Sequence, residues 1–298
     1  MMPECFPMLT SGTPEQHAGQ SVCHNPGMAQ QTSVNPFDQL ARYYDWEHAD
    51  YDIDVPLYLD FARRTGGPIL ELACGSGRLM APLLELGEEV VGIDSSAPML
   101  ERARQFLANG GGSKGGAGKG GGALLRRATV QQADVRHFRL KRRFQLAIYG
   151  LDSFGLLEGI DDQLAALRSI REHLEPGGLL ILDVSNGNGR GTEPTDELVL
   201  QYDGFDPETG LPLSKWTARS TDHGEQVDHY TYFYDQVGAD GLVRRSVVRL
   251  DLRYFGRYEL ELLLLMAGLE PEMFYGSYDL APYAAGSERM IAVAARGH

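Results

Sequence analysis

The stretch ILELACGSGRL, residues 69–79, runs an apolar segment directly into a turn that contains two glycines. The segment ILEL has the character of a buried strand, because it is short, apolar and bounded by turn residues. Glycine adopts backbone angles that other residues avoid, and it lets the main chain approach a bound molecule closely. The stretch therefore predicts a strand, a ligand-binding turn and the start of a helix.

Apolar segments and amphipathic helices alternate on both sides of this turn. The predicted strands are residues 68–73, 89–94, 128–134, 144–150 and 179–184. The predicted helices are residues 37–46, 55–67, 77–87, 96–110 and 161–178. Short, nearly continuous apolar strands between such helices are typical of a parallel sheet with both faces covered. We therefore predict a doubly wound, Rossmann-like α/β fold with a mostly parallel seven-stranded sheet.

After Val184 the pattern changes to the two-residue period of antiparallel strands. The segments with this period are residues 214–221, 227–237 and 242–255. The segments that then return to the main sheet are a helix at 257–270 and strands at 272–280 and 289–297. This order predicts a small antiparallel β-sheet inserted into the α/β domain.

The chain is expected to divide into a tail, a main domain and an insertion. Residues 1–34 are rich in Pro, Gly, Gln, Ser and Thr without periodicity, which predicts a disordered tail. Residues 35–190 and 256–298 form the predicted main domain, and residues 191–255 form the inserted sheet. The glycine-rich run at 110–122 joins a helix end to the next strand, away from the strand ends where ligands bind. We interpret it as a flexible linker without a function of its own.

The composition limits the setting and the partners of the protein. Its 298 residues are 43% hydrophobic and 23% charged, as in ordinary globular proteins. The formal net charge of −14 disfavours a nucleic-acid partner. There is no apolar run of membrane-spanning length and no CxxC pair among the three cysteines. The first 20 residues have no basic segment followed by an apolar core, so we expect no secretory signal. We therefore expect a cytoplasmic protein without a membrane or nucleic-acid partner.

Three kinds of ligand compete for the glycine turn: a phosphate, a dinucleotide, or a molecule without phosphate. A phosphate-binding loop needs the pattern GxxxxGK[ST], which is absent. A dinucleotide turn needs a third glycine, and Met80 occupies that place. Asp94, at the end of the second strand, suits a pair of ribose hydroxyls, and Asp134, at the end of the third, suits an adenine amino group. The turn and these two acids, in this order, form a specific combination.

These segments resemble the motifs of the class I S-adenosylmethionine-dependent methyltransferases. ELACGSGR resembles their E/DxGxGxG motif, with Ala73 in place of the first glycine. VVGIDSSAPML, QQADVRHF and FQLAIYGLDSFGLL resemble the second, third and fourth motifs, and LEPGGLLILDV resembles the fifth strand after its helix. The resemblance covers residues 36–185 and 256–296. It implies an enzyme that transfers methyl groups and whose cofactor is S-adenosyl-L-methionine.

The resemblance also assigns residues to that cofactor. Glu71 and the glycine turn would surround its methionine part, Asp94 would bind the ribose, and Asp134 would cap the adenine. The full set of implied cofactor-binding residues is Tyr44, Glu71, Ala73, Gly75, Gly77, Asp94, Ser95, Met99, Asp134, Val135, Gly150 and Leu151. No metal is required for this chemistry, and we find no cluster of metal ligands in the sequence.

The turn after the fourth strand bears on the methyl acceptor. It reads Gly150-Leu-Asp-Ser-Phe154 and lacks the Asn/Asp-Pro-Pro-aromatic motif of DNA amino-methyltransferases, so a nucleobase is disfavoured. The segment RYYDWEHADY resembles an N-terminal helix that closes over the cofactor in small-molecule N-methyltransferases, and Tyr44 best matches its tyrosine. Asp152 is a candidate for orienting or deprotonating the acceptor. Tyr44 and Asp152 are therefore the candidate catalytic residues.

The inserted sheet is expected to roof the acceptor site. Its candidate acceptor-binding residues are Trp216, His229, Tyr230, Tyr232 and Arg253. A shift of one residue in strand register exchanges the two faces of the sheet, so the sequence does not determine which of these residues face the acceptor.

The predicted function is methyl transfer by in-line displacement to the amine or hydroxyl of a small molecule. The protein mainly aligns and desolvates the reactants, and a general base is needed only if the acceptor arrives protonated. The alternatives are a cofactor-binding module without catalysis, or an NAD- or nucleotide-binding protein on a similar fold. A monomer or a homodimer is expected.

Overall fold

The computed structural model describes residues 35–111, 121–187 and 197–297. The predicted tail at 1–34 and most of the predicted linker at 110–122 lie outside these ranges. In the described part of the chain, no helix is long and apolar enough to cross a membrane.

The main sheet has seven strands in the order β10-β11-β5-β4-β1-β2-β3. These strands are β1 (Ile69–Leu72), β2 (Val90–Asp94), β3 (Ala128–Gln132), β4 (Phe144–Tyr149), β5 (Leu174–Ser185), β10 (Leu269–Tyr275) and β11 (Arg289–Arg296). Neighbouring strands pair in parallel from β5 to β3, and β11 pairs antiparallel with both β5 and β10. The predicted doubly wound, mostly parallel seven-stranded sheet is thus confirmed.

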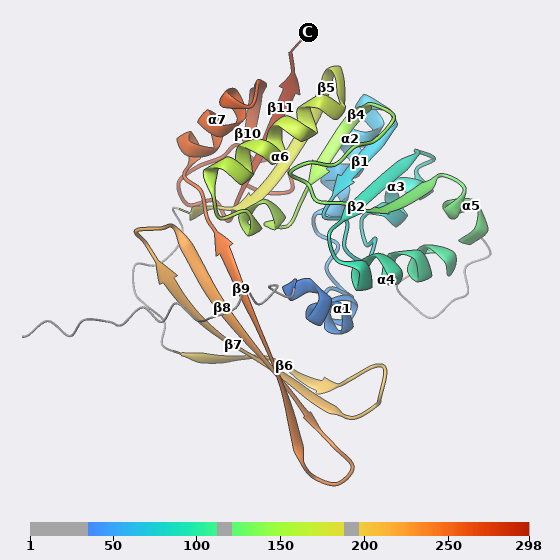
Figure 1. Ribbon diagram of the computed structural model, residues 1–298, viewed down its shortest axis with the longest axis vertical. Helices are drawn as coiled ribbons and strands as arrows, with labels where there is room; N and C mark the ends of the chain where they lie inside the picture. Colours follow the sequence, from blue (N-terminus) through green and yellow to red (C-terminus); the bar gives the residue numbers. More distant parts are fainter. Residues whose placement is uncertain (1–34, 112–120, 188–196, 298) are drawn as a thin grey trace, which may run out of the picture. The chain divides into compact units, whose positions relative to one another are not determined.

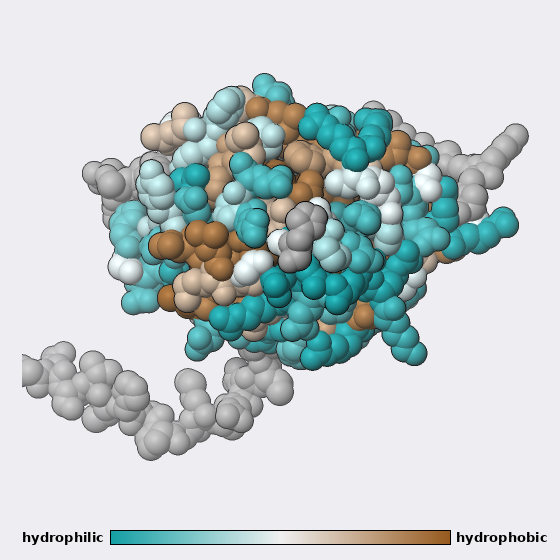
Figure 2. Space-filling view, turned by 90° about the horizontal axis from the view of Figure 1, so that it is seen from above, coloured by the Kyte–Doolittle hydropathy of each residue, from teal (hydrophilic) through white to brown (hydrophobic). Residues whose placement is uncertain are grey.

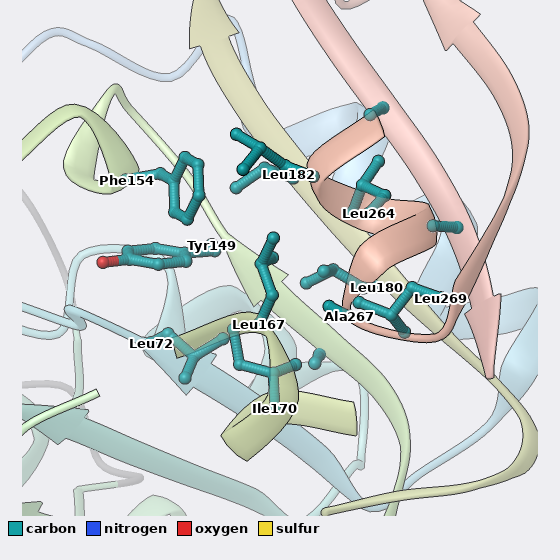
Figure 3. Packing of buried hydrophobic residues seen from close by; sticks show 14 of the residues in the cluster. Leu72, Tyr149, Phe154, Leu167, Ile170, Leu180, Leu182, Leu264, Ala267 and Leu269 are labelled. Carbon is teal, nitrogen blue, oxygen red and sulfur yellow. The ribbon is translucent and has the colours of Figure 1, made fainter. Parts of the chain in front are cut away.

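Helices cover both faces of this sheet (Figure 1). They are α2 (Val55–Thr65), α3 (Met80–Glu85), α4 (Ala97–Ala108), α5 (Gly121–Leu125), α6 (Ile160–His173) and α7 (Arg257–Met266), with a short 3₁₀ turn η1 (Ser153–Leu156) after β4. On one face, Leu167 and Ile170 of α6 and Leu264 of α7 pack with Leu72 and Tyr149 (Figure 3). On the other, α2, α3 and α4 form a second apolar cluster against the same strands. Because both faces are buried, the strands need their nearly continuous apolar sequences.

A separate antiparallel sheet has the order β6-β7-β8-β9. Its strands are β6 (Leu198–Phe205), β7 (Pro212–Asp222), β8 (Val227–Val237) and β9 (Val243–Arg253). In its register Tyr232 lies opposite Val248, and His229 lies opposite Asp251. Val248 is buried whereas Asp251 is exposed, so one face of the sheet is covered and the other meets solvent. The division of the chain into a main domain and an insertion at 191–255 stays a prediction.

Helix α1 (Pro36–Glu47) lies between the two sheets (Figure 1). Asn35 caps it by accepting a hydrogen bond from the Phe37 N–H, and Pro36 starts the first turn with a fixed φ angle. The Tyr43 ring stacks on Tyr234 of β8, with ring centroids 3.8 Å apart and an interplanar angle of 4°. Leu40 packs in the same cluster. This apolar contact positions α1 over the carboxyl ends of the main strands.

The surface seen from the end of the molecule that carries the carboxyl terminus is mostly polar, with a few apolar patches (Figure 2). Exposed apolar side chains do occur on α7, for example Leu262 and Met266. Neither side chain lines the cavities described below.

Candidate functional site

The turn after β1, residues 73–77 (the glycine turn), has an unusual backbone. Ala73, Gly75 and Gly77 have φ angles of 50°, 54° and 82°. Glycine takes such angles without strain, whereas alanine there costs about 1–2 kcal/mol. A side chain on Gly77 would also begin 3.3 Å from the Cβ of Ala103 in α4. The turn therefore needs its two glycines, and Ala73 is held in place at a cost.

Met80, which occupies the place of a third glycine, packs against a glycine of the next strand. A Cβ added to Gly92 of β2 would lie 2.6 Å from the Met80 sulfur and 2.8 Å from the Cys74 sulfur. The close approach of helix to strand is thus made possible by the strand, not by the helix. Burial raises the pKa of the Cys74 thiol well above its usual range, so this side chain acts as an apolar group and not as a nucleophile.

Asp94 at the end of β2 braces the glycine turn. One carboxylate oxygen accepts a hydrogen bond from the Gly75 N–H at 2.9 Å, and the other accepts one from the Ser96 N–H at 2.8 Å. Burial raises the pKa of Asp94, and these backbone hydrogen bonds oppose the shift. Each carboxylate oxygen keeps a further lone pair for a ligand hydroxyl.

A small cavity opens beside the turn (the turn cavity). It has a volume of about 30 Å³, and its lining includes Tyr44, Glu71, Ala73, Arg78, Gly150 and Leu151. Glu71 Oε2 is buried and has no hydrogen-bond partner among the described residues. Burial raises the pKa of Glu71 to about 8; nearby Asp54 and Asp94 add to the shift, and Arg78 opposes it. An unpaired buried carboxylate is costly, which favours a cationic ligand group at this place.

Arg78 directly follows the glycine turn, and its positive charge opposes the rise in the pKa of Glu71. Its guanidinium binds both oxygens of the buried Asp54, at 2.8 and 2.6 Å, and donates to the Tyr51 carbonyl. This bidentate pair fixes Arg78 in the wall of the turn cavity.

A second network holds the turn after β4. Asp183 of β5 is fully buried and accepts hydrogen bonds from the Leu151 N–H and from the Tyr58 hydroxyl, at 3.2 and 3.0 Å. Arg289 of β11 pairs with Asp183 at 2.6 Å and with Asp152 at 2.9 Å. Leu151 and Asp152 both have positive φ angles, so these contacts stabilise a strained turn. They also leave Asp152 paired with the Arg289 guanidinium.

A larger cavity lies under α1 (the α1 cavity). It has a volume of about 180 Å³. Its apolar lining includes Phe37, Leu40, Leu156, Leu250 and Leu252, and its polar lining includes Tyr44, Glu47, His48, Asp152, Ser153 and Tyr232. Tyr44, Leu151 and Ser153 also line the turn cavity. The two cavities therefore share a wall.

Polar contacts fasten α1 on both sides of these cavities. Toward α4, the Ser96 hydroxyl donates to Asp38 at 2.7 Å, and Arg102 pairs with Asp45 at 2.7 Å. Toward the second sheet, Lys215 pairs with Glu47 at 2.5 Å. The helix thus connects the glycine-turn side of the site with the sheet that covers it.

The structure gathers only part of the predicted cofactor set. Tyr44, Glu71, Ala73, Gly150 and Leu151 line the turn cavity. The residues just outside it are Gly75, Gly77, Asp94 and Met99, of which Gly75 would place a Cβ 3.8 Å from both the Met99 and the Tyr44 side chains.

The residues that were predicted to bind the adenine do not line the turn cavity. Strand β3 ends at Gln132, before Asp134. The Asp134 carboxylate pairs with Arg136 at 2.5 Å, and this contact lowers its pKa. Val135 packs against the apolar core, and Ser95 accepts a hydrogen bond from Asn35. Their part in binding an adenine stays a prediction.

The predicted acceptor residues of the second sheet fall on different sides. Tyr232 lines the α1 cavity, and Tyr230 stacks beside it with ring centroids 5.9 Å apart. His229 is exposed and pairs with Asp251, and Trp216 alternates with the buried Lys215 and Thr217 on the opposite face of β7. Arg253 pairs with Glu259 of α7 at 2.9 Å. The last three residues are therefore not brought to the α1 cavity.

Several cavity residues were not predicted from the sequence. Arg78 and Asp54 line the turn cavity, and Glu47 and His48 line the α1 cavity. Arg78 directly follows the two glycines of the turn, and this position could have indicated that Arg78 and its partner Asp54 belong to the site. Within the described ranges, no three His, Cys, Asp or Glu residues are placed to hold a metal ion.

Comparisons with known proteins agree with this geometry. Residues 69–178 match a family model described as a methyltransferase domain. A dTDP-3-amino-3,4,6-trideoxy-alpha-D-glucopyranose N,N-dimethyltransferase of Streptomyces venezuelae is 29% identical over 153 residues, which cover 50% of this chain and 57% of that protein. The match therefore spans less than two thirds of that relative's length.

Two longer matches extend the comparison. The cypemycin N-terminal methyltransferase of a Streptomyces species is 27% identical over 240 residues, covering 78% of this chain and 84% of that protein. The solved structure of the CcbJ methyltransferase from Streptomyces caelestis aligns with a TM-score of 0.72 and 24% identity, covering 89% of this chain and 99% of that one. Residues 69–178 thus match a methyltransferase domain, and the chain has the fold of the solved methyltransferase structure.

Proposed function

We propose that the protein methylates an amine of a small molecule held in the α1 cavity. The observation that carries this proposal is the wall that the α1 cavity shares with the turn cavity, formed by Tyr44, Leu151 and Ser153. An acceptor in the α1 cavity and a cofactor in the turn cavity would meet across this wall. Displacement in line with the bond that breaks needs such an approach, and alignment of this kind supplies up to about 7–11 kcal/mol.

The residues of the turn cavity fit the cofactor. S-adenosyl-L-methionine supplies a methyl group that its sulfonium sulfur has already activated. The unpaired oxygen of Glu71 suits the ammonium of the methionine part, and Arg78 adds a positive charge for the carboxylate. Asp94, which holds the glycine turn by its backbone, would accept the ribose hydroxyls with its remaining lone pairs.

Tyr44 would close the site. Its ring lies over the glycine turn and stacks on His48, with centroids 4.1 Å apart. Burial raises the pKa of its hydroxyl, so this group stays protonated and acts by hydrogen bonding and by excluding water, not as a base. Asp152, the second predicted catalytic residue, would orient the acceptor while it remains paired with Arg289.

An amine is favoured over a hydroxyl as the acceptor. One relative described above is named an N,N-dimethyltransferase of an amino sugar, and another is named an N-terminal methyltransferase. The cavity combines apolar walls with polar groups that can hold an amine, among them Glu47, His48 and Asp152. The lining does not resemble a nucleic-acid groove. We further propose that the protein is cytoplasmic and that it is a monomer or a homodimer. Light scattering after size-exclusion chromatography would test the oligomeric state.

Binding and turnover together test the proposed function. S-adenosylhomocysteine should raise the melting temperature, whereas NAD should leave it unchanged; the reverse would support the dinucleotide alternative. Isotope-labelled S-adenosyl-L-methionine should then transfer its methyl group to members of a panel of aliphatic and sugar amines and not to the matching alcohols. Binding without transfer to any amine or alcohol would support a non-catalytic module.

A further inference from the structure

His48 forms the end of α1 and is held in one orientation. Its backbone N–H and its ring Nδ1 both lie within hydrogen-bond distance of the Tyr44 carbonyl, at 3.0 and 2.9 Å. A carbonyl oxygen only accepts, so Nδ1 must carry the hydrogen. In the neutral ring, Nε2 then carries the lone pair. The ring also stacks on Tyr44 and meets the edge of Tyr51, with centroids 6.3 Å apart.

The carboxylates that line the α1 cavity are already engaged. Glu47 accepts hydrogen bonds from Lys215 Nζ and from the Tyr234 hydroxyl, both at 2.5 Å, one on each oxygen. Asp152 accepts from the Ser185 backbone and hydroxyl and pairs with Arg289. Each of the two carboxylates therefore has a cationic partner before any ligand binds.

The phenols of the cavity are also unsuited to accept a proton. Burial raises the pKa of the Tyr44 and Tyr232 hydroxyls, so both stay protonated. By contrast, no described residue donates a hydrogen bond to His48 Nε2. Apart from these protonated phenols, His48 is the ionisable group of this cavity whose accepting atom takes no hydrogen bond from a described residue.

Building on the proposed function, we propose that His48 Nε2 is the general base that deprotonates the acceptor, and that the acceptor is an amine which arrives as an ammonium ion. The proton of the ammonium passes to Nε2, and the nitrogen regains its lone pair. That pair forms the bond to the methyl carbon while the carbon–sulfur bond breaks and its electrons stay on sulfur. The methylated product leaves as an ammonium ion, and His48 returns its proton to water.

The charges around His48 keep it neutral before the reaction. Burial lowers its pKa most; Arg78 and Lys215 lower it further, whereas the Tyr44 carbonyl and Glu47 raise it. Asp152 on the opposite wall is neutralised by Arg289. The pKa therefore lies below the ordinary value of histidine, and the base is ready at neutral pH. General bases of this kind accelerate reactions about 10²–10⁴-fold.

The variant His48→Asn tests this role. Asparagine places an amide N–H where Nδ1 lies, so the bond to the Tyr44 carbonyl is kept while the base is removed. We expect kcat for the best amine acceptor to fall about 100-fold or more near pH 7, with the dissociation constant of S-adenosylhomocysteine changed less than about twofold, because the bonds of the turn cavity are unaffected. His223→Asn, an exposed histidine in the turn after β7, serves as the matched control and should keep the wild-type kcat.

The pH profile separates a base from a packing residue. The wild-type kcat should be flat above neutral pH, because His48 is already neutral there. In His48→Asn, kcat should climb about tenfold per pH unit toward the pKa of the amine, because only free amine then reacts. If kcat of His48→Asn is lower by the same factor at every pH and its pH dependence matches the wild type, the proposal is overturned, because altered packing has this effect.

Nitrogen NMR gives a readout that does not depend on turnover. In protein with ¹⁵N-labelled histidine and bound S-adenosylhomocysteine, the His48→Asn spectrum identifies the His48 signals. Nε2 should show the shift of an unprotonated nitrogen, and adding the amine should move it. A hydrogen on Nε2 and not on Nδ1 would overturn the proposal. If the wild type methylates amines but His48→Asn matches it, only the assignment of the base fails; if the wild type methylates none, the proposed function fails and this proposal with it.

Discussion

Replacing Glu71 by glutamine should stabilise the ligand-free protein and weaken its cofactor binding. The side chain keeps its shape but loses a carboxyl group whose Oε2 is buried without a partner. In the ligand-free protein burial opposes ionisation of this group, so folding at neutral pH requires it to take up a proton at a cost in stability. In the complex the negative charge of Glu71 is needed, because it faces the cationic end of the proposed ligand. The two effects have opposite signs, which makes the prediction sharp.

The pKa of Glu71 sets the size of the first effect. It rises from an ordinary value of 4.5 to about 8 in the folded protein. Its favourable contribution to stability is therefore complete below about pH 4.5 and is lost as the pH rises toward 8, because the unfolded chain releases this proton first. Near pH 7 the loss is about 3 kcal/mol, at about 1.4 kcal/mol per pH unit above 4.5.

Urea unfolding between about pH 5 and pH 8 measures this loss. The wild-type free energy of unfolding should fall by about 3 kcal/mol more than that of Glu71→Gln over this range. Glu85→Gln, at an exposed position at the end of α3, should follow the wild type. Calorimetry should show that S-adenosylhomocysteine binds Glu71→Gln more weakly by about 1.5–3 kcal/mol, the range for a hydrogen bond between charged partners.

Proton release gives the decisive check. Below pH 8 the wild-type Glu71 is largely protonated, so binding of a cationic group should expel its proton. Calorimetry near pH 6.5 in buffers of different ionisation enthalpy should therefore detect proton release in the wild type and less in Glu71→Gln. If both proteins release the same number of protons and bind with the same affinity, Glu71 does not face the ligand's ammonium.

Three further predictions concern the rest of the site. Asp94→Ala should weaken binding of S-adenosylhomocysteine by about 1.5–3 kcal/mol in calorimetry, because two hydrogen bonds to a charged group are lost. S-adenosylhomocysteine should protect residues 36–46 from hydrogen exchange more than any other segment, and Tyr44→Phe should lower its affinity modestly, because α1 closes the site. Replacing residues 110–122 by a short Gly-Ser link should leave methyl transfer unchanged, as expected for the linker without function predicted from the sequence, because changing the length of a loop costs little entropy.

Each of these predictions has an outcome that contradicts it. A folded Asp94→Ala variant with wild-type affinity would remove Asp94 from the ribose site. Equal exchange of residues 36–46 with and without S-adenosylhomocysteine would make Tyr44 an ordinary packing residue. A large loss of cofactor affinity in the protein with the shortened link would show that residues 110–122 reach the cavity.

The main sheet was predictable because the sequences of its strands are themselves typical of buried β-strands. The central strands β1, β2 and β4 are short apolar runs that are buried on both faces, as in parallel sheets covered by helices. The predicted helix at 77–87 was too long: α3 spans only Met80–Glu85, because Gly77 and Gly87, both with positive φ, belong to the flanking turns. Strand β6 (Leu198–Phe205) was missed, because this edge strand is largely exposed and shows no clear alternation of buried and exposed residues.

The site was predictable where motifs define it and not where packing does. The resemblance to methyltransferase motifs assigns Glu71 and Gly150 to the site, and both line the turn cavity. Glu47 and His48 could not be predicted, because the side of α1 that faces the cavity depends on how Tyr43 packs against the second sheet. Trp216 was a reasonable candidate by residue type, but the register of β7 turns it away from that cavity.

The position of α1 has a consequence for the order of events in turnover. Tyr44 forms part of the wall of both cavities, and α1 is fastened at both ends, by Asp38 to α4 and by Glu47 to the second sheet. On the proposed function, we therefore expect α1 to move when either ligand exchanges. An acceptor in the α1 cavity would also block the path past the shared wall. Steady-state kinetics should accordingly show a compulsory sequence, with the cofactor binding first and its demethylated product leaving last.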